Sequence, residues 1–512
     1  MSAIETTGPV VPRVMIAAPH GRSGKTVLTL GLLRALRRQG CAVQPFKKGA
    51  DFIDPGWHTV AAGRTSRNLD RYFMEPDQIR AVVRGASAGA DVCVVEAAMG
   101  LYDGLDAEGS TSSAEIAKIT ATPVVLVLDV TRMTRTAGAL VLGCCAFDTD
   151  VRIAGVILNR VRGARQRALV TEVIERTCGI PVVGAVPADA RLNVPDRHLG
   201  LVTSGETDER ERLLDGIADV VAEWVDLDAV RAIAASAGEL PAAEASTDAV
   251  PQAAWAAAHG EAESEVAASA PTGAQASGVT GPAAPAGVVR GDADAARATI
   301  AVVRDEAFSF YYPENLAALE RAGARLVFVR SLGDEALPSD VDGLYVGGGF
   351  PEEFAEQLQA NEAFRRSVRE RAEHGLPVYA ECGGLMYLGR RLVHRGRSYD
   401  MAGVLGLDTV VQDRQTAHGY ARAVVDASGS WLDPGMVLVG HEHHHSQATD
   451  LDPALRFAYA VERGRGIVPG FDGACTGNVV AGYLHVNALA SPAWAPSFVR
   501  AAERYRALRS AR

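Results

Sequence analysis

A short apolar run that leads directly into a glycine-rich turn and a helical pattern constrains the fold of this chain more than any other feature. Residues 13–18 read RVMIAA, residues 19–26 read PHGRSGKT, and leucines then recur three and four apart up to residue 39. A continuous apolar run favours a strand buried on both faces, and the leucine spacing favours an amphipathic helix. The segment therefore predicts a parallel α/β fold in which backbone N–H groups of the turn converge at a helix N-terminus.

Further apolar runs divide the chain into two α/β regions. Buried-strand patterns lie in the first region at 91–97, 123–130, 152–159 and 180–186, and in the second at 300–305, 325–330, 343–348, 377–381 and 479–485. Between the regions, a stretch rich in Ala, Gly, Ser, Pro and Glu has too little apolar surface to offset its ordering entropy. We predict domains at 1–237 and 298–512 and a flexible linker at 238–297. A partly helical Ala-rich insertion is the alternative, which the Pro and Gly content disfavours.

The composition excludes several classes of protein. The 512 residues hold 51 Lys and Arg against 62 Asp and Glu, and the resulting net charge of −11 disfavours a nucleic-acid binder, which normally has a basic face. The first residues show no signal-peptide pattern, and the apolar runs are too short to cross a bilayer. Seven cysteines without a C-x-x-C pair favour a reducing compartment. We therefore expect a cytoplasmic protein without nucleic-acid or membrane partners.

The turn at 19–26 carries the pattern of a phosphate-binding P-loop. Gly21 and Gly24 let backbone amides approach phosphate oxygens, and Lys25 reaches the terminal phosphates. The Thr26 hydroxyl suits a magnesium ion. Pro19 replaces the first glycine of the usual pattern, but strand, loop and helix follow in the required order. A chance glycine- and serine-rich turn is the alternative. The loop predicts binding of a nucleoside triphosphate with Mg²⁺.

Acidic residues near this loop predict a metal–phosphate site that faces an anionic acceptor. Glu96 ends an apolar strand pattern, where P-loop proteins carry a magnesium-binding acid, and a loop with two glycines and Asp103 follows. The polar segment between the two motifs adds Asp51 and Asp54, three residues apart, and basic residues that include Lys47. An ordinary surface loop is the plainer alternative for each acid taken singly.

The second region contains one cysteine in the setting of a nucleophile. Cys382 stands between an apolar strand pattern and a helical run, with Gly383 directly after it. Such a nucleophile elbow presents the side chain at a sharp turn, and the helix N-terminus favours the thiolate. The Gly383 amide can donate to an oxyanion, and we expect a second donor in the triple-glycine loop at Gly348. The other six cysteines are expected to be ordinary core or surface thiols.

A histidine distant in sequence is expected to act as the base for this cysteine. His485 ends the strand pattern at 479–485, and sites of α/β proteins collect at the carboxyl ends of strands. The competing candidate is the HEHHHS cluster at 441–446, which also invites a metal interpretation. Neighbouring histidines on one strand point to opposite faces and cannot all reach one ion, so we favour His485.

Together these motifs resemble the cobyrinic acid a,c-diamide synthase family over residues 13–235 and 298–505. The matching strings are APHGRSGKT, FKKGADFIDPGWH, EAAMGLYDG, VPDRHLGL, DEAFSFYYPENL, GGGFPEEFAEQL, AECGGLMYLG, GHEHHHS and GYLHVN. The resemblance implies a P-loop parallel-sheet ATP domain followed by a flavodoxin-like class I glutamine amidotransferase domain, both α/β. It also implies ATP- and glutamine-dependent amidation of the a and c side-chain carboxylates of cobyrinate or hydrogenobyrinate in cobalamin biosynthesis, through an acyl phosphate.

The resemblance also implies roles for matching positions of this chain. Cys382 and His485 would form the glutaminase pair, with Gly348 and Gly383 as the oxyanion hole. The positions matched to Mg²⁺ are Thr26, Asp51 and Glu96, and those matched to the acceptor and acyl phosphate are Lys47, Asp54, Tyr102 and Asp103. The positions matched to ATP are His20, Gly21, Ser23, Gly24, Lys25, Thr26 and Asn159.

Some positions depart from the family pattern, and some alternatives stay open. Asn487 stands two places after His485, where the family commonly has histidine and many class I amidotransferases have glutamate. Either Asn487 orients the imidazole, or the cysteine and histidine work as a dyad. The rival functions are the same amidation of a sirohydrochlorin, nickel-sirohydrochlorin or sirohaem, and a regulatory P-loop ATPase with an inactive amidotransferase module. The expected partners are a tetrapyrrole polycarboxylate, ATP and glutamine, with a homodimer as a further expectation.

Overall fold

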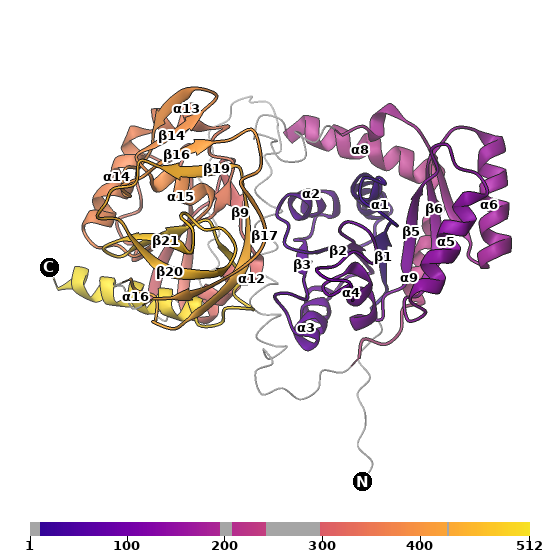
Figure 1. Ribbon diagram of the computed structural model, residues 1–512, viewed down its shortest axis with the longest axis horizontal. Helices are drawn as coiled ribbons and strands as arrows, with labels where there is room; N and C mark the ends of the chain where they lie inside the picture. The colour runs from indigo at the N-terminus through magenta and orange to yellow at the C-terminus, as the bar shows by residue number, and fades with distance from the viewer. Residues whose placement is uncertain (1–10, 195–206, 242–296, 427–429, 512) are drawn as a thin grey trace, which may run out of the picture. The chain divides into compact units, whose positions relative to one another are not determined.

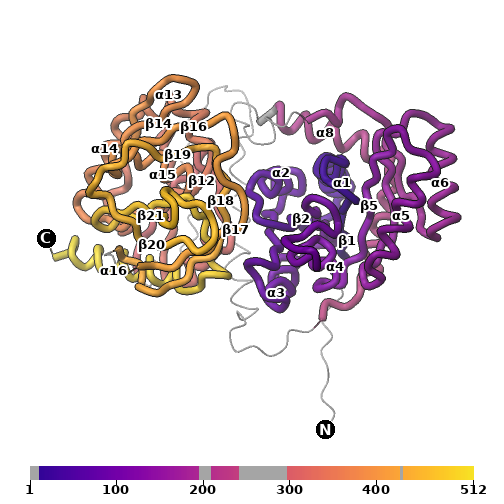
Figure 2. Tube along the Cα trace, in the orientation of Figure 1, coloured from indigo at the N-terminus to yellow at the C-terminus, as the bar shows by residue number. Residues whose placement is uncertain are grey.

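The computed structural model describes residues 11–194, 207–241, 297–426 and 430–511. The chain divides into two compact units, 1–257 and 258–512, which Figure 1 colours from indigo to magenta and from orange to yellow. Figure 2 traces the same course as a tube. Most of the predicted linker at 238–297 lies outside the described residues. The finer domain boundaries stay predictions.

A seven-stranded parallel sheet forms the centre of the first unit, in the order β3-β2-β4-β1-β5-β6-β7. Four of the apolar runs and the run before the P-loop are strands, as predicted. The two strands at the β3 edge were not predicted, because VQPFKK contains a proline and three polar residues and RNL is only three residues long. The strands are β1 (Arg13–Ala17), β2 (Val43–Lys48), β3 (Arg67–Leu69), β4 (Val92–Glu96), β5 (Val124–Asp129), β6 (Ile153–Val161) and β7 (Val182–Pro187).

Helices cross between these strands and cover the sheet. Val14 and Ile16 of β1 share one apolar core with residues of α1, α8 and α9, as expected for a strand buried by crossover helices. The carboxyl ends of neighbouring β1 and β4 therefore meet at one edge of the sheet, where α/β proteins place ligands. The helices are α1 (Lys25–Arg38), α2 (Ile53–Ala62), α3 (Pro76–Ala86), α4 (Ser113–Ile119), α5 (Thr136–Phe147), α6 (Ala164–Cys178), the 3₁₀ turn η1 (Ala190–Leu192), α8 (Thr207–Trp224) and α9 (Leu227–Ala235).

The second unit is built on a ten-stranded sheet in the order β10-β8-β11-β13-β22-β21-β20-β17-β18-β23. Its first five strands are parallel and are the five that the sequence predicts: β8 (Ala298–Val303), β10 (Ala324–Val329), β11 (Gly343–Val346), β13 (Val378–Glu381) and β22 (Val479–Gly482). The antiparallel extension consists of β17 (Ala417–Val425), β18 (Val437–His444), β20 (Arg456–Arg463), β21 (Phe471–Thr476) and β23 (His485–Val486).

Smaller sheets and helices complete this unit. A two-stranded sheet pairs β9 (Phe308–Phe310) with β12 (Gly348–Gly349), and a four-stranded sheet holds β14 (Arg391–His394), β15 (Arg397–Asp400), β16 (Asp408–Val411) and β19 (Ser446–Thr449). The helices are α12 (Pro313–Arg321), α13 (Ala355–Ala360), α14 (Glu362–Glu373), α15 (Gly383–Leu388) and α16 (Trp494–Ser510). None of the helices in the described part of the chain has the length and apolar character that a membrane crossing needs.

Alternation along β13 sends its side chains into two different cores. Val378 and Ala380 pack with residues of α13, α14 and α15, whereas Tyr379 packs with residues of α12 and α16 on the opposite face. By the same period of two, the side chain of Glu381 points to the face of Tyr379. A carboxylate therefore enters an apolar layer directly before Cys382.

Candidate active sites

The P-loop between β1 and α1 is held in one shape by the residues around it. Gly24 begins the helix with a φ of 92°, and a Cβ at this position would lie 2.3 Å from Nδ2 of Asn159. Asn159 Nδ2 donates to the Ser23 carbonyl at 2.9 Å, and the Ser23 hydroxyl donates to the His20 carbonyl at 2.8 Å. Gly24 is therefore required twice, for its backbone conformation and for the close approach of Asn159. Asn159 contacts the loop itself; an additional ATP contact stays a prediction.

The loop after β4 packs directly against the P-loop. Leu101 N donates to the Ala18 carbonyl at 2.8 Å, and Lys25 Nζ donates to the Met99 carbonyl at 2.6 Å. The Lys25 ammonium is largely buried, and this burial lowers its pKa from the ordinary value. A carbonyl acceptor thus holds the lysine beside the loop, close to the place where the charge of bound phosphates would be.

Glu96 is the centre of the buried polar cluster beside the P-loop. Its Oε1 accepts hydrogen bonds from Thr26 Oγ1 at 2.6 Å and from Lys47 Nζ at 2.8 Å, and its Oε2 lies 2.6 Å from His58 Nε2. Burial opposes ionisation of Glu96, but the Lys47 charge and the His58 hydrogen bond outweigh it and bring the pKa of Glu96 below its ordinary range. The carboxylate is therefore ionised and fixed by three partners.

Lys47 links this cluster to the acids of the following loop. Its Nζ also donates to Asp54 Oδ2 at 2.5 Å and lies 4.0 Å from Asp51 Oδ2. Although burial disfavours the ammonium, the Asp54 and Glu96 charges raise the pKa of Lys47. Burial and the neighbouring Asp54 raise the pKa of Asp51, whose side chain is 30% exposed. Lys47 thus brings Glu96 and Asp54 together, and Asp51 lies at the partly exposed side of this cluster.

The donor set beside the P-loop fits a magnesium ion. The Thr26 hydroxyl and the Glu96 carboxylate meet at 2.6 Å, and both are the oxygen ligands that Mg²⁺ prefers. No group of three or more His, Cys, Asp or Glu side chains arranged for a metal occurs within the described residues. Mg²⁺ is commonly held by one or two protein oxygens together with waters and substrate phosphates, so two protein donors are enough. Asp51 is not brought to Thr26 by any contact that the structure records.

Two residues predicted near the acceptor have other partners. The Tyr102 hydroxyl donates to the Cys144 carbonyl of α5 at 2.6 Å, and its ring packs against Phe147. Asp103 Oδ2 accepts a hydrogen bond from Gly100 N at 2.8 Å and closes the turn after β4. Both therefore shape the loop that follows Glu96, and their contact with an acceptor stays a prediction.

His58 is the residue of this site that the sequence analysis missed. It lies in α2, is fully buried, and meets the buried Glu96 across the cluster. The signal was present in the string FIDPGWH, because a histidine four residues after Asp54 lies on the same face of a helix. Only the packing of α2 on the sheet reveals its partner.

Cys382 occupies the sharp turn that the sequence predicts. It has φ 49° and ψ −98°, a strained conformation for a residue with a side chain, and its N–H donates to the Gly482 carbonyl of neighbouring β22 at 2.7 Å. A Cβ on Gly384 would lie 2.4 Å from the Val346 carbonyl, and a Cβ on Gly383 would lie 3.0 Å from Gly349 N. The two glycines are therefore required for the elbow to approach the triple-glycine loop.

The expectation of a thiolate at the elbow is wrong for the resting structure. The Cys382 side chain is only 6% exposed, and its Sγ lies 3.8 Å from the His443 carbonyl. Burial and the negative charge of Glu352 raise the pKa of the Cys382 thiol, because they oppose a second anion there. The short α15 helix does not outweigh them. The thiol therefore needs a base during the reaction.

The expectation that His485 ends the strand at 479–485 is wrong, because β22 ends at Gly482 and His485 begins the next strand. It follows β22 in β23, pairs with His441 of β18, and is 1% exposed. The two imidazole rings stack with centroids 4.9 Å apart, and a Cβ on Gly348 would lie 2.4 Å from His485 Cε1. Burial lowers the pKa of His485 to about 3, so the ring is neutral and able to accept a proton. Gly348, Cys382 and His485 thus follow the carboxyl ends of three neighbouring parallel strands, β11, β13 and β22.

Asn487 does not orient this imidazole through its carbonyl oxygen. Asn487 Oδ1 accepts hydrogen bonds from Leu489 N at 3.0 Å and Ala490 N at 3.4 Å, which close the turn after β23. Of the histidines at 441–446, His441 and His444 are buried while His443 and His445 are exposed. By the period of two, His441 and His443 lie on one face of β18 and His444 on the other. The described residues offer these histidines no further ligands for a metal site.

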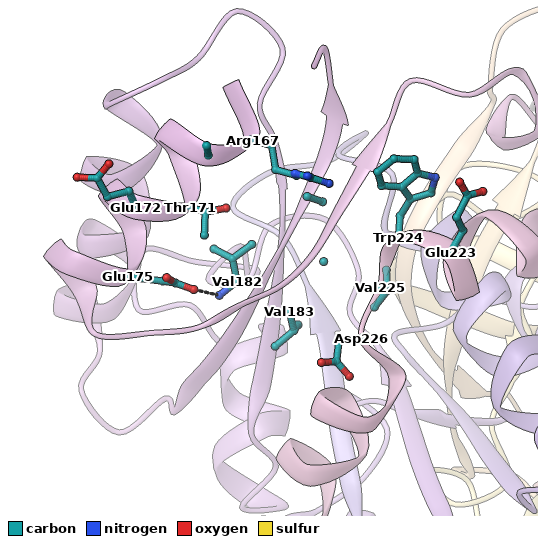
Figure 3. Close-up of a pocket in the computed structure, with 13 residues that line it drawn as sticks. Arg167, Thr171, Glu172, Glu175, Val182, Val183, Glu223, Trp224, Val225 and Asp226 are labelled. Carbon is teal, nitrogen blue, oxygen red and sulfur yellow. Dashed lines mark hydrogen bonds between the residues drawn. The ribbon is translucent and has the colours of Figure 1, made fainter. Parts of the chain in front are cut away.

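A cavity of about 630 Å³ lies elsewhere, at the edge strand β7 (Figure 3). Arg167 and Trp224 approach each other across it, with the guanidinium carbon 6.0 Å from the indole centroid, and Glu175 accepts a hydrogen bond from Val182 N at 3.3 Å. None of the predicted site residues lines it. We assign no function to this cavity.

Comparisons with known proteins give the same division into two parts. Residues 14–202 match the model of the CobQ/CobB/MinD/ParA nucleotide binding domain, and residues 299–493 match that of the CobB/CobQ-like glutamine amidotransferase domain. The chain is 38% identical over 490 residues to the cobyrinate a,c-diamide synthase of Magnetococcus marinus, covering 96% of this chain and 97% of that protein.

Two further relatives are also similar to this chain over nearly their whole length. The chain is 40% identical over 493 residues to the cobyrinate a,c-diamide synthase of Archaeoglobus fulgidus, covering 96% of this chain and 98% of that protein. It is 38% identical over 512 residues to the hydrogenobyrinate a,c-diamide synthase of Streptomyces coelicolor, again covering 96% and 98%. The similarity therefore includes both sites and nearly the whole length of each relative.

Proposed function

The chain belongs to the cobyrinate a,c-diamide synthase family, and from this premise we propose that it amidates the a and c side-chain carboxylates of cobyrinate or hydrogenobyrinate. It is a glutamine-dependent, amide-forming ligase of cobalamin biosynthesis that uses ATP. One observation carries the proposal above the others. A single chain holds a P-loop whose Thr26 hydroxyl contacts Glu96, and a cysteine elbow packed on the glycine loop that contacts the buried His485.

In the first unit, a substrate carboxylate attacks the terminal phosphate of ATP and forms an acyl phosphate, which supplies the leaving group that a carboxylate lacks. The P-loop amides and Lys25 bind the phosphates. Glu96 and Thr26 would hold Mg²⁺, which would offset phosphate charge. Lys47 fixes Glu96 and Asp54 in the acceptor region. Ammonia then displaces phosphate and leaves the amide.

In the second unit, Cys382 attacks the side-chain amide of glutamine. The thiol proton passes to His485, the sulfur bonds to the amide carbon, and the backbone amides of Gly348 and Gly383 stabilise the oxyanion. The C–N bond breaks, and the proton on the imidazole leaves with ammonia. Water then hydrolyses the thioester to glutamate and regenerates the thiol.

Several finer points belong to the same proposal. The ATP domain is residues 1–237, the linker is 238–297, and the amidotransferase domain is 298–512. Mg²⁺ is the metal, supported by the oxygen donors that meet beside the P-loop. The protein works in the cytoplasm, where ATP and glutamine are available, and a homodimer is its expected oligomeric state.

Product mass spectrometry tests the proposed function. The protein is incubated with MgATP and glutamine and, in parallel, with hydrogenobyrinic acid, cobyrinic acid and sirohaem. Two successive conversions of a carboxylate to an amide on a corrin alone are the expected result. Amidation of sirohaem alone would overturn the substrate and keep the chemistry. Absence of amidation in every reaction, with ATP still bound, would favour a regulatory ATPase.

A further inference from the structure

A buried carboxylate lies directly before the nucleophile and has no place in the mechanism above. Glu381 is the last residue of β13 and is 1% exposed. Its Oε1 accepts a hydrogen bond from Val486 N at 3.0 Å, and its Oε2 accepts one from the Tyr345 hydroxyl at 3.0 Å. A buried carboxyl group is costly unless it is hydrogen-bonded, and these two donors fix it in one orientation.

The same carboxyl group faces the ring of the base. Glu381 Oε2 lies 3.8 Å from His485 Nδ1, and its other oxygen holds the backbone of Val486, the residue next to His485. Because Nδ1 is turned toward Glu381, Nε2 lies on the other side of the ring, and Nε2 is the nitrogen that exchanges a proton with Cys382 in the mechanism above. The stacked ring of His441 and the close approach of Gly348 limit rotation of the imidazole.

We propose that Glu381 is the positioning residue that completes the glutaminase group. It holds the imidazole of His485 through Nδ1 and stabilises the imidazolium that forms when Nε2 takes the proton of Cys382. Glu381 itself exchanges no proton with the substrate. Catalytic hydrogen bonds are often long in a resting site and shorten when the ring becomes charged. The inference rests on the proposed function and fills the place that Asn487 does not.

Several titratable groups surround the pair. The tyrosines near Glu381 are Tyr345 of β11, Tyr379 of β13 and Tyr459 of β20. The histidines near His485 all belong to β18 and are His441, His443 and His444. Burial raises the pKa of Glu381 to about 8, although the Val486 amide and the Tyr345 hydroxyl lower it. The ionised fraction of Glu381 therefore increases as the pH crosses 8, and we expect the rate of glutamine hydrolysis to rise with it.

The test measures glutamate release by the full chain with the variant Glu381→Gln, which keeps the shape and removes the charge. We expect kcat for glutamine hydrolysis, measured above pH 8 where Glu381 is ionised, to fall by at least about tenfold, because the loss of an orienting carboxylate costs more than this in comparable sites. We expect KM for glutamine to stay within about threefold and the rise near pH 8 to disappear. Ammonium-dependent amidation stays at the wild-type level, because the ligase site is unchanged.

Glu442→Gln is the matched control. Glu442 is equally buried in the same unit, but its carboxylate accepts hydrogen bonds from Arg465 N and Gly466 N. This variant should keep the wild-type pH profile. Tyr345→Phe is an independent second variant: it removes a hydrogen bond that lowers the pKa of Glu381, so the rise in activity should move to higher pH.

The possible results separate this inference from the proposed function. A smaller fall in kcat, a loss confined to KM, or an unchanged rise near pH 8 in Glu381→Gln would overturn the positioning role while glutamine hydrolysis by the wild type still supports the proposed function. If Glu381→Gln does not fold, an unmoved profile in Tyr345→Phe overturns the role. A wild-type chain that releases no glutamate would overturn the proposed function and this inference with it.

Discussion

The imidazole of His58 and the carboxylate of Glu96 form a fully buried pair, with Nε2 and Oε2 2.6 Å apart. Glu96 comes from β4 and His58 from α2, so a contact across 38 residues fixes the carboxylate that also receives the Thr26 hydroxyl of α1. Oε1 of Glu96 therefore faces the P-loop, while Oε2 is held by His58 of α2. The arrangement ties the geometry of the phosphate site to the packing of α2.

Replacement of His58 by alanine should destabilise the first unit. The variant leaves a buried, ionised carboxylate without one partner, and a hydrogen bond to a charged group contributes about 1.5–3 kcal/mol. We expect a loss of this size in the free energy of unfolding and a fall in ATP-dependent amidation, with glutamine hydrolysis retained. Chemical unfolding and the two separate assays measure these effects. The exposed His374→Ala should stay within about 0.5 kcal/mol of wild type; equal stability of the two variants would contradict the role of the pair.

Replacement of Cys382 by alanine should separate the two nitrogen sources. The variant has no nucleophile, so glutamine-dependent amidation and glutamate release are abolished, whereas amidation with added ammonium continues. Product analysis with each nitrogen source measures the difference. Cys41→Ala, in the other unit, is the thiol control and should support both reactions. Glutamine-dependent synthesis by Cys382→Ala would refute the assignment of the nucleophile.

Replacement of Lys25 by alanine should have the opposite pattern. Removal of one preorganised charge from the phosphate site is expected to lower amidation by on the order of 10²- to 10³-fold with glutamine or with ammonium. Glutamate release measured on its own should continue. Lys118→Ala removes a partly exposed lysine that pairs with Asp148 and should change neither rate. A Lys25 variant with normal amidation would exclude a phosphate contact for this residue.

The free energy of unfolding of the first unit should decrease at acid pH, because Glu96 then loses its charge. Its pKa is lowered in the folded state, so its contribution is complete above the unfolded value of about 4.3 and is lost as the pH falls through the folded value. The pKa of Lys47 is raised, so its contribution is present below about 10.4 and is lost as the pH rises further through the folded value. The cluster therefore stabilises most between about pH 5 and 10.

Calorimetry of the full chain between pH 3 and 7 measures the acid part of this dependence, with the transition of the first unit identified by its shift on addition of ATP. The slope should be smaller in Glu96→Gln, because the group that loses its charge is absent. Asp51, whose pKa is raised, acts in the opposite sense and is present in both proteins. The control Glu172→Gln, with a side chain that is 64% exposed, should keep the wild-type slope. An equal slope in all three proteins would contradict the prediction.

Shortening of the predicted linker should have little effect on turnover. Halving a flexible chain changes the effective concentration of the joined parts by about threefold at most, following the −3/2 power of its length. We expect glutamine-dependent turnover to stay within that range when roughly half of residues 242–296 is deleted. Steady-state kinetics with glutamine and with ammonium test this. A collapse of turnover, with both units still active in their separate assays, would show that the linker has a further role.

Local patterns predict much of this fold because strand burial and helix periodicity are written in neighbouring residues. The central parallel strands of both units follow apolar runs, and the elbow at Cys382 follows from a strand, a cysteine and two glycines in sequence. Strands β2 and β3 and the antiparallel strands β17, β20 and β21 were not predicted. Their short or mixed polar patterns do not predict strands, because such segments form strands only when they pair with a neighbouring strand.

The sequence by itself determined which residues carry chemistry, since the spacing of glycines, lysine and threonine in the P-loop and the setting of Cys382 are properties of the chain alone. Tertiary structure decided which buried side chains position these residues and change their pKa values. His58 reaches Glu96, and Glu381 reaches His485, through contacts 38 and 104 residues apart along the chain. It also decided that burial and Glu352 raise the pKa of the Cys382 thiol. Burial and charge depend on what surrounds a side chain in space, and no local pattern records this.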